Sequence, residues 1–164
     1  MGYKLIALDI DGTLLNSSNQ ITENVKEAIR KSKEKGVKVV LCTGRPLKGV
    51  ENFLDELNLK EEGDYVSTFN GALVQDAHTG KPISHLTLDY EDLCDLYDLS
   101  VEVGSRSHFY DTRTVYTFNR DVSDYTILEA YLTGVHLNVT ELDEVPKDIA
   151  MSKFMMIDHP EILN

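Results

Sequence analysis

The stretch Lys4-Leu5-Ile6-Ala7-Leu8-Asp9-Ile10-Asp11-Gly12-Thr13-Leu14-Leu15 decides the fold of this 164-residue chain. An almost unbroken apolar run ends in two aspartates, and a glycine follows them at once. Short apolar runs bounded by turn residues are typical of β-strands buried on both faces, as in a parallel sheet. We therefore predict a central strand that carries Asp9 and Asp11 at its carboxyl end, where open α/β sheets bind their ligands.

The two aspartates need an explanation, because burying two like charges costs free energy unless a cation or a proton offsets them. A divalent metal ion is the obvious candidate. Asp-Gly also occurs in hairpin turns, and aspartates open the calcium loops of EF-hands. However, residues 12–15 lack the later oxygen ligands of an EF-hand loop, and a hairpin turn does not account for Asp9. A functional acid pair is the better interpretation.

The next segment predicts a βαβ unit. Thr22 is a good helix N-cap, apolar residues at helical spacing follow it, and Gly36 is a natural helix end. Val37 to Cys42 then forms a second buried strand, so the chain builds a Rossmann-like parallel sheet. Further along, the pattern predicts a helix over 47–57, a strand over 65–69 and a hairpin over 75–83.

From about Ser84 the pattern changes. It predicts a helix that begins at Asp89 and ends at Gly104, strands over 108–111 and 114–118, a helix over 124–132 and a strand over 153–157. Helices and neighbouring strands without glycine-marked βα turns indicate an α+β module. We therefore assign residues 1–83 to an α/β core domain and residues 84–164 to an α+β module. A last helix begins near Pro160 and has one turn before Asn164, so we interpret the chain as a fragment.

Two polar turns follow the second and third predicted strands. In Thr43-Gly44-Arg45-Pro46 the hydroxyl can donate to a phosphoryl oxygen, and the guanidinium suits a phosphate clamp. Asn70-Gly71 occupies the corresponding place after the third strand. Simpler interpretations stay open: Thr43 as a helix N-cap, Arg45 as a surface charge, and Asn-Gly as a tight turn into another strand. The neighbouring acid pair favours a functional role for Thr43.

These residues resemble known motifs. Asp9-Ile10-Asp11-Gly12-Thr13-Leu14-Leu15 resembles the first motif of the haloacid dehalogenase (HAD) superfamily. Cys42-Thr43-Gly44-Arg45-Pro46 and Asn70-Gly71-Ala72 resemble its Cof-type branch (subclass IIB), to which the YidA-like sugar-phosphate phosphatases belong. Such proteins are longer, and their last two motifs lie beyond where this chain stops. The resemblance implies an incomplete HAD core and an incomplete cap module, which closes over the active site and selects the substrate.

The resemblance also implies a mechanism, in which phosphoryl transfer proceeds through a covalent aspartyl-phosphate. Asp9 is the implied nucleophile, and Asp11 protonates the leaving group and then activates water. Mg²⁺ is the implied cofactor, held by the Asp9 carboxylate and the Asp11 carbonyl. The implied phosphate and substrate contacts are Gly12, Thr43, Gly44, Arg45, Asn70 and Gly71. A lysine and further acidic ligands belong to the later motifs, so this fragment is expected to have low activity.

Composition narrows the partners and the compartment. Asp and Glu number 28 against 16 Lys and Arg, and the net charge of −12 argues against nucleic acid and anionic membranes as partners. The opening segment does not fit a signal peptide, and no apolar run has membrane-spanning length. Cys42 and Cys94 lie far apart, which favours reduced thiols and a cytoplasmic protein over a disulfide. The five histidines lack the paired spacing of structural zinc ligands.

Three other functions remain open from the sequence. The chain could be a non-catalytic phosphate-binding or interaction domain that keeps the fold alone. It could also be a phosphomutase or phosphotransferase of the same superfamily, acting on a small phosphate ester. Finally, missing strands would leave an apolar sheet edge, which predicts self-association or completion by a partner chain.

Overall fold

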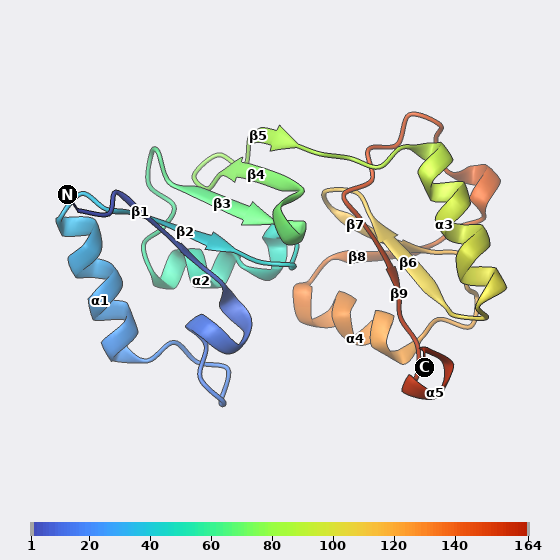
Figure 1. Cartoon of the computed structure of the whole chain (residues 1–164), viewed down its shortest axis with the longest axis horizontal. Coiled ribbons are helices and arrows are strands. Elements are labelled where there is room, and N and C mark those ends of the chain that lie inside the picture. Colours follow the sequence, from blue (N-terminus) through green and yellow to red (C-terminus); the bar gives the residue numbers. More distant parts are fainter. Residues whose placement is uncertain (1, 164) are drawn as a thin grey trace. The chain divides into compact units, whose positions relative to one another are not determined.

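The computed structural model describes residues 2–163 and divides into two compact units (Figure 1). The N-terminal unit ends at His85, and the C-terminal unit begins at Leu86. Strands and helices occur in both units, so the α/β class predicted from the sequence is confirmed. The interpretation of the chain as a fragment was based on a helix that stops at Asn164, and this residue lies outside the described residues. None of the helices in residues 2–163 combines the length and the apolar content that a bilayer crossing needs.

A five-stranded sheet in the order β1-β2-β3-β4-β5 forms the N-terminal unit. Its strands are β1 (Leu5–Leu8), β2 (Lys38–Cys42), β3 (Tyr65–Thr68), β4 (Leu73–Asp76) and β5 (Pro82–His85). The first three strands are parallel, as predicted, and β4 and β5 add an antiparallel hairpin. Leu8 lies opposite Leu41, and Cys42 lies opposite Ser67. The three parallel strands therefore end at the same edge of the sheet.

The position of β1 corrects one prediction. It is an edge strand, and among the described residues it pairs with β2 alone. Its side chains are exposed or half-buried, and Leu5 keeps 54% of its surface exposed. The expectation of a central strand buried on both faces was wrong for this chain, because no described strand covers the outer edge of β1. The buried apolar strand is β2, where Val39, Val40 and Leu41 are all buried.

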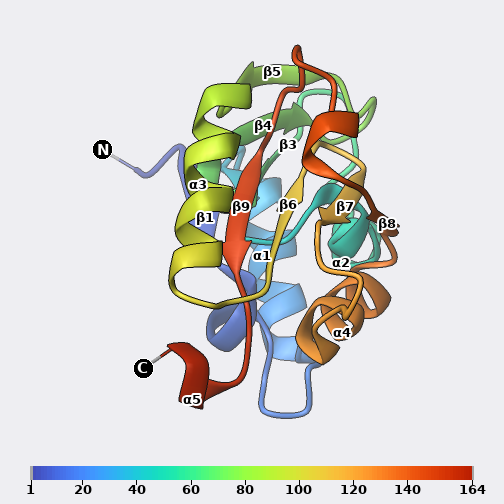
Figure 2. The same cartoon turned by 90° about the vertical axis from the view of Figure 1, so that its right-hand side faces the viewer.

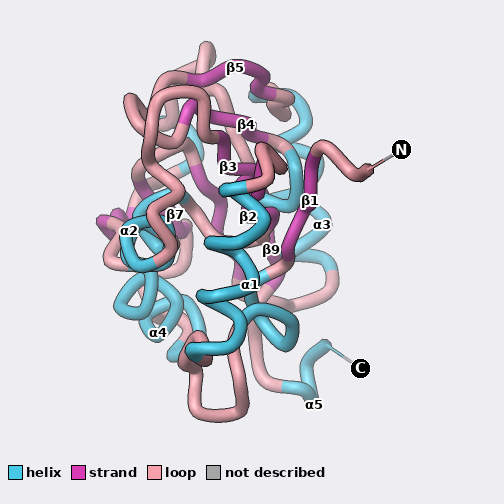
Figure 3. The backbone as a smooth tube through the Cα atoms, turned by 90° about the vertical axis from the view of Figure 1, so that its left-hand side faces the viewer, coloured by secondary structure: helices cyan, strands magenta, loops and turns pink. Residues whose placement is uncertain are grey.

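The segments between the parallel strands are helical. After β1 comes the short turn η1 (Ile10–Leu14), and α1 (Glu23–Glu34) then packs against β2 and buries Ile29 (Figure 3). The single helix predicted over 47–57 is wrong. The chain forms a 3₁₀ turn, η2 (Leu47–Gly49), and then α2 (Glu51–Glu56). Val50 separates them, because its φ of −127° is not helical and its side chain is fully buried.

The C-terminal unit contains a four-stranded sheet in the order β8-β7-β6-β9 (Figure 2). Its elements are α3 (Tyr90–Glu102), β6 (Ser107–Tyr110), β7 (Thr114–Thr117), α4 (Asp124–Thr133), β8 (His136–Val139), η4 (Leu142–Glu144), β9 (Lys153–Met156) and α5 (Pro160–Leu163). Asp89 caps α3 as predicted, since its side chain accepts the backbone N–H groups of Glu91 and Asp92. The sequence analysis missed β8, which pairs in parallel with β7.

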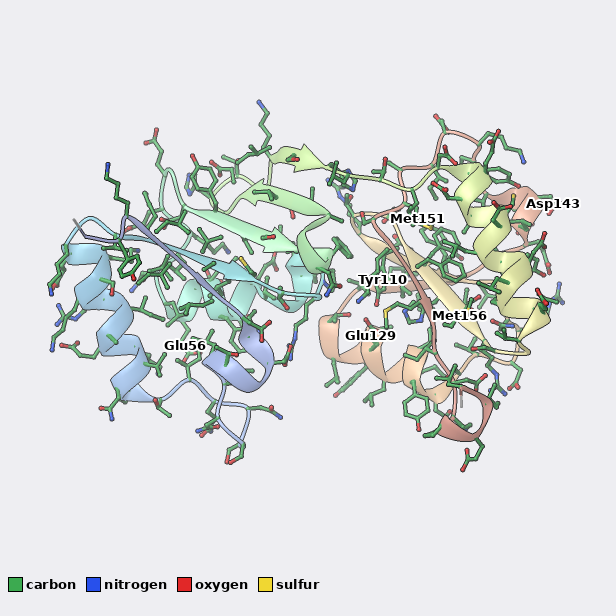
Figure 4. All side chains as sticks on the ribbon, viewed as in Figure 1. Glu56, Tyr110, Glu129, Asp143, Met151 and Met156 are labelled. Atoms are coloured by element: carbon green, nitrogen blue, oxygen red, sulfur yellow. The ribbon has the colours of Figure 1, made fainter. Side chains whose placement is uncertain are left out.

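The two faces of β6 differ in chemistry. Phe109 belongs to the apolar core, whereas His108 and Tyr110 lie on the other face, toward α4. The Nδ1 atom of His108 is 2.9 Å from the hydroxyl oxygen of Thr126, and its Nε2 atom is 3.5 Å from Glu129 without a hydrogen bond. Figure 4 shows Tyr110 on β6 and Glu129 on the neighbouring helix. Burial, with a contribution from the charge of Lys153, lowers the pKa of His108 to about 4.

This buried histidine predicts loss of stability in mild acid. An unfolded histidine titrates near pH 6.5, so between pH 6.5 and about 4 the unfolded chain binds more protons than the folded one. The free energy of unfolding should therefore fall as the pH falls through this window, by up to roughly 3 kcal/mol in total. Urea denaturation at pH 7 and pH 5 measures the effect.

The matched variants are His108→Gln and His136→Gln, because His136 is exposed on β8. His108→Gln should reduce the difference in unfolding free energy between the two pH values, and His136→Gln should leave it unchanged. An equal pH dependence in wild type and His108→Gln would show that His108 is not the group responsible.

Candidate active site

The turns that follow β2 and β3 are joined directly by backbone hydrogen bonds. The N–H of Thr43 donates to the carbonyl of Ser67 at 2.9 Å, and the N–H of Asn70 donates to the carbonyl of Thr43 at 2.9 Å. Because β1 ends at the same edge, the three polar segments predicted from the sequence follow neighbouring parallel strands. This edge is where open α/β sheets bind their ligands.

The acid pair lies at the start of the turn η1, where Asp9 is the N-cap residue and Asp11 is the second residue of the turn. Asp9 leaves β1, and its carbonyl accepts the N–H of Leu14 at 3.2 Å. Ile10 and Leu14 are buried and anchor the turn, whereas Asp9, Asp11 and Gly12 are exposed. The φ of Gly12 is +77°, a value that side-chain-bearing residues adopt with strain. The expectation that both carboxylates are buried was therefore wrong, because Ile10, between the two aspartates, takes the buried position.

Arg45 is held by Asp11. Its Nε atom donates to Oδ2 of Asp11 at 2.9 Å and its Nη2 atom to Oδ1 at 2.5 Å, in a two-pronged ion pair. The guanidinium also lies 5.7 Å from the centre of the Phe53 ring, and Nη1 is 3.5 Å from the carbonyl of Gly49. Planar two-pronged pairs fix orientation as well as charge. Arg45, predicted as a phosphate clamp, thus holds Asp11, the implied acid–base residue. The sequence analysis did not predict this contact.

Thr43, Gly44 and Asn70 form a close-packed set beside this pair. Thr43 is buried, and its hydroxyl oxygen accepts the N–H of Arg45 at 3.2 Å, so the O–H itself remains a donor. A Cβ atom on Gly44 would lie 3.0 Å from Oδ1 and 3.1 Å from Nδ2 of Asn70. Only glycine allows the amide of Asn70 to approach this closely. Gly71 follows with a φ of +96°, which again suits glycine.

Cys42 lies at the end of β2 but lacks the properties of a nucleophile. Burial raises the pKa of its thiol, a hydrogen bond with Ser67 opposes that shift, and the negative charge of Asp9 adds to it. A raised pKa keeps the thiol protonated at neutral pH, and the thiol form reacts slowly. Cys42 and Cys94 are both free, as the sequence predicted.

The carboxylates of Asp9 and Asp11 could supply some, but not all, of the oxygen ligands of a divalent cation. Within residues 2–163 no group of three or more Asp, Glu, His or Cys side chains is arranged to hold a metal ion. Asp9 and Asp11 do offer exposed carboxylate oxygens next to an exposed stretch of backbone. Mg²⁺ prefers oxygen ligands, keeps several waters and needs few protein carboxylates. The two aspartates therefore fit part of a magnesium site.

A groove between α1 and the end of α2 does not compete for phosphate. This groove has a volume of about 410 Å³, and Glu56, labelled in Figure 4, lies on its wall. Its three cations already have acidic partners: Lys26 pairs with Glu23 and Glu56, Arg30 with Glu27 and Glu34, and Lys33 with Glu61. A phosphate group would find no uncompensated positive charge among these lining residues.

Comparison with known proteins identifies the family. A family model described as haloacid dehalogenase-like hydrolase matches residues 6–164. "Putative phosphatase YxeH" of Bacillus subtilis is 56% identical over 162 residues, which are 99% of this chain and 60% of that protein. The 5-amino-6-(5-phospho-D-ribitylamino)uracil phosphatase YitU of the same organism is 27% identical over 180 residues, covering 98% of this chain and 63% of the relative.

A solved structure agrees with these matches. The crystal structure of a haloacid dehalogenase-like hydrolase from Bacteroides thetaiotaomicron superposes with a TM-score of 0.80 and 27% identity, over 99% of this chain and 60% of that one. This chain therefore spans about 60% of the length of the curated relatives it matches. The family model covers nearly all of the chain, and the predicted motifs lie on one sheet edge. The chain belongs to the haloacid dehalogenase-like hydrolase family.

Proposed function

We propose that the protein hydrolyses small phosphate monoesters, with sugar phosphates as the substrate class, through an aspartyl-phosphate on Asp9. One observation carries the proposal: Asp11 is held by Arg45 on the same sheet edge at which Asp9, Thr43 and Asn70 lie. The exposure of Asp9 supports its role, because a nucleophile that attacks phosphorus must be reachable.

Each residue has a distinct task in this scheme. An oxygen of Asp9 attacks phosphorus, and the bond to the ester oxygen breaks as Asp11, which takes up a proton before this step, gives that proton to the departing alcohol. Asp11 then takes a proton from the water that attacks the aspartyl-phosphate, which releases inorganic phosphate and regenerates Asp9. Thr43 donates its O–H to a phosphoryl oxygen, and the amide of Asn70 shapes the same pocket. Gly44 lets the amide of Asn70 approach the backbone closely, and Gly12 and Gly71 allow the positive φ angles of their turns.

Mg²⁺ is the proposed cofactor, held by the Asp9 carboxylate and the carbonyl of Asp11. When bound, it neutralises charge so that a phosphate dianion can approach a carboxylate. The charge of the chain supports this need, because its net charge is −12 and Arg45 is already paired with Asp11.

The C-terminal unit is the proposed cap module, and the substrate class rests on its chemistry and on one relative. Its described residues 86–163 form a sheet with helices of its own, as an insert that selects substrates requires. The relative YitU is named as a phosphatase for a phosphoribityl compound, which is a phosphorylated polyol. A sugar phosphate shares the primary phosphate ester and the neighbouring hydroxyl groups.

Two further proposals concern the cellular compartment of the protein and its self-association. The free thiols of Cys42 and Cys94 support a reducing compartment, and we place the protein in the cytoplasm. The open edge of β1 supports self-association through strand pairing, since an unpaired edge offers backbone groups to another chain.

The test is phosphate release from p-nitrophenyl phosphate and from a set of hexose and pentose phosphates, with Mg²⁺ and with EDTA. We expect release that EDTA suppresses, at a rate roughly 10²–10³-fold or more below that of the Bacillus relative YxeH assayed in parallel. The expected deficit follows from the lack of a third acidic ligand near Asp9 and Asp11 within residues 2–163. Equal rates would contradict the low activity, and transfer of phosphate to an added sugar instead of water would contradict hydrolysis.

A further inference from the structure

The turn after β3 has an unusual backbone (Figure 1). Phe69, Asn70 and Gly71, here called the arch, have successive φ angles of +50°, +58° and +96°. Glycine adopts such angles freely and asparagine adopts them fairly often, but for a bulky aromatic residue they are strained. The Phe69 side chain is only 2% exposed. Burial of the ring therefore keeps the backbone of residue 69 in a conformation that it would otherwise leave.

The arch contacts three consecutive residues of the turn after β2. The N–H of Phe69 donates to the carbonyl of Arg45 at 3.2 Å, and the N–H of Asn70 donates to the carbonyl of Thr43 at 2.9 Å. Between these two bonds, the side-chain amide of Asn70 lies against the Cα of Gly44. An extended conformation at residue 69 would turn the N–H of Asn70 away from the carbonyl of Thr43 while the N–H of Phe69 stays on Arg45, because φ and ψ of a residue set the direction of the next peptide unit.

The chain of contacts continues to the acid. Arg45, whose carbonyl is held by the arch, holds both oxygens of Asp11 with its guanidinium. We propose that Phe69 is a positioning residue for the active site: its buried ring fixes the arch, the arch fixes residues 43–45, and Arg45 thereby presents Asp11. This inference rests on the proposed function for its catalytic meaning, but the mechanical link can be measured without any turnover.

The experiment compares three variants by amide hydrogen exchange and NMR. Phe69→Gly removes the ring but places glycine, which accepts a positive φ, at this position. The variant therefore tests the loss of the buried ring without adding backbone strain. Phe69→Leu keeps an apolar side chain and serves as the conservative rescue. Ile29→Ala is the control, because Ile29 is buried in the same unit but lies on α1, a different element from the arch. Urea denaturation of each variant corrects exchange rates for global stability.

After that correction, Phe69→Gly should speed exchange of the amides of residues 69 and 70 by about tenfold or more. Phe69→Leu keeps part of the apolar anchor and should give a smaller, several-fold rise in exchange, and Ile29→Ala should leave the protection unchanged. The backbone NMR signals of Arg45 and Asp11 should move in Phe69→Gly only. Should Phe69→Gly not fold, the prediction passes to Phe69→Leu, whose smaller side chain should raise exchange of these two amides several-fold above the control.

Unchanged protection at residues 69 and 70 in the folded Phe69 variants would overturn the inference and leave Phe69 as a core residue alone. Binding of orthovanadate, followed by the same NMR signals, separates this result from the proposed function. If wild type does not bind vanadate but the arch loosens as expected, the phosphatase proposal fails while the mechanical link stands. If wild type binds it, Phe69→Gly should weaken its affinity about tenfold and Ile29→Ala should not.

Discussion

Replacing Asp9 by asparagine is expected to abolish phosphate-ester hydrolysis while the fold stays intact. Asparagine has the shape of aspartate but no nucleophilic oxygen, so the covalent step cannot occur. The loss should reach about 10⁴-fold or more, as for other enzymes that lose their nucleophile. Stability should change little, because Asp9 is exposed and the hydrogen bond from Leu14 goes to its backbone carbonyl.

Covalent trapping identifies the nucleophile directly. Beryllofluoride, followed by ¹⁹F NMR, should label wild type in the presence of Mg²⁺ and should fail to label Asp9→Asn. Asp11→Asn is the matched variant, because it changes the neighbouring exposed aspartate in the same way. It should retain labelling and lose turnover, since an acid–base residue acts on the leaving group and on water. Labelling of Asp9→Asn would assign the nucleophile to another residue.

The second large effect is expected from Arg45. Arg45→Met keeps the length of the side chain but removes the guanidinium that holds Asp11 with bonds of 2.9 and 2.5 Å. The Asp11 carboxylate would then rotate freely in solvent, because its side chain is already 57% exposed. We expect kcat/KM to fall by roughly 10²-fold, the size of effect seen when one oriented electrostatic group is lost.

The controls separate orientation from charge and from stability. Arg45→Lys restores the charge without the two-pronged geometry, so its kcat/KM should lie between those of wild type and Arg45→Met. Arg30→Met removes another ion-paired arginine, which is exposed on α1 and pairs with Glu27 at 2.7 Å, and should leave kcat/KM unchanged. Urea denaturation should show less than about 1 kcal/mol of destabilisation for either methionine variant. Equal kcat/KM for Arg45→Met and wild type would contradict the role given to Arg45.

Local patterns made most of the fold predictable. The helix α1 carries its own end signal in Gly36, and α3 begins at Asp89, whose capping geometry is encoded within four residues. The acid turn after β1 and the polar turn after β2 were also predictable, because both follow apolar runs directly. Signals of this kind lie within a few residues of the structure that they determine.

Features that depend on distant residues were not predictable in this way. The exposure of β1 depends on which strands lie beside it, and β8 was missed because its four residues are mostly exposed and half polar. Arg45 and Asp11 are 34 positions apart, so no short sequence pattern predicts their ion pair. Phe69 follows a segment with aromatic and β-branched residues that predicts a strand, yet it has a positive φ in the folded chain.

The place of β1 has a consequence for the order of assembly. Its first residue pairs with a partner 33 positions later, Leu5 with Lys38, whereas β3, β4 and β5 meet through short hairpins. Contacts between residues distant in the chain form late, because more chain entropy is lost in closing the loop. We therefore expect the strand that carries the nucleophile to dock last during folding. The catalytic turn would be completed only after the rest of its unit is built, and any chain that joins the free side of β1 would hasten that final step.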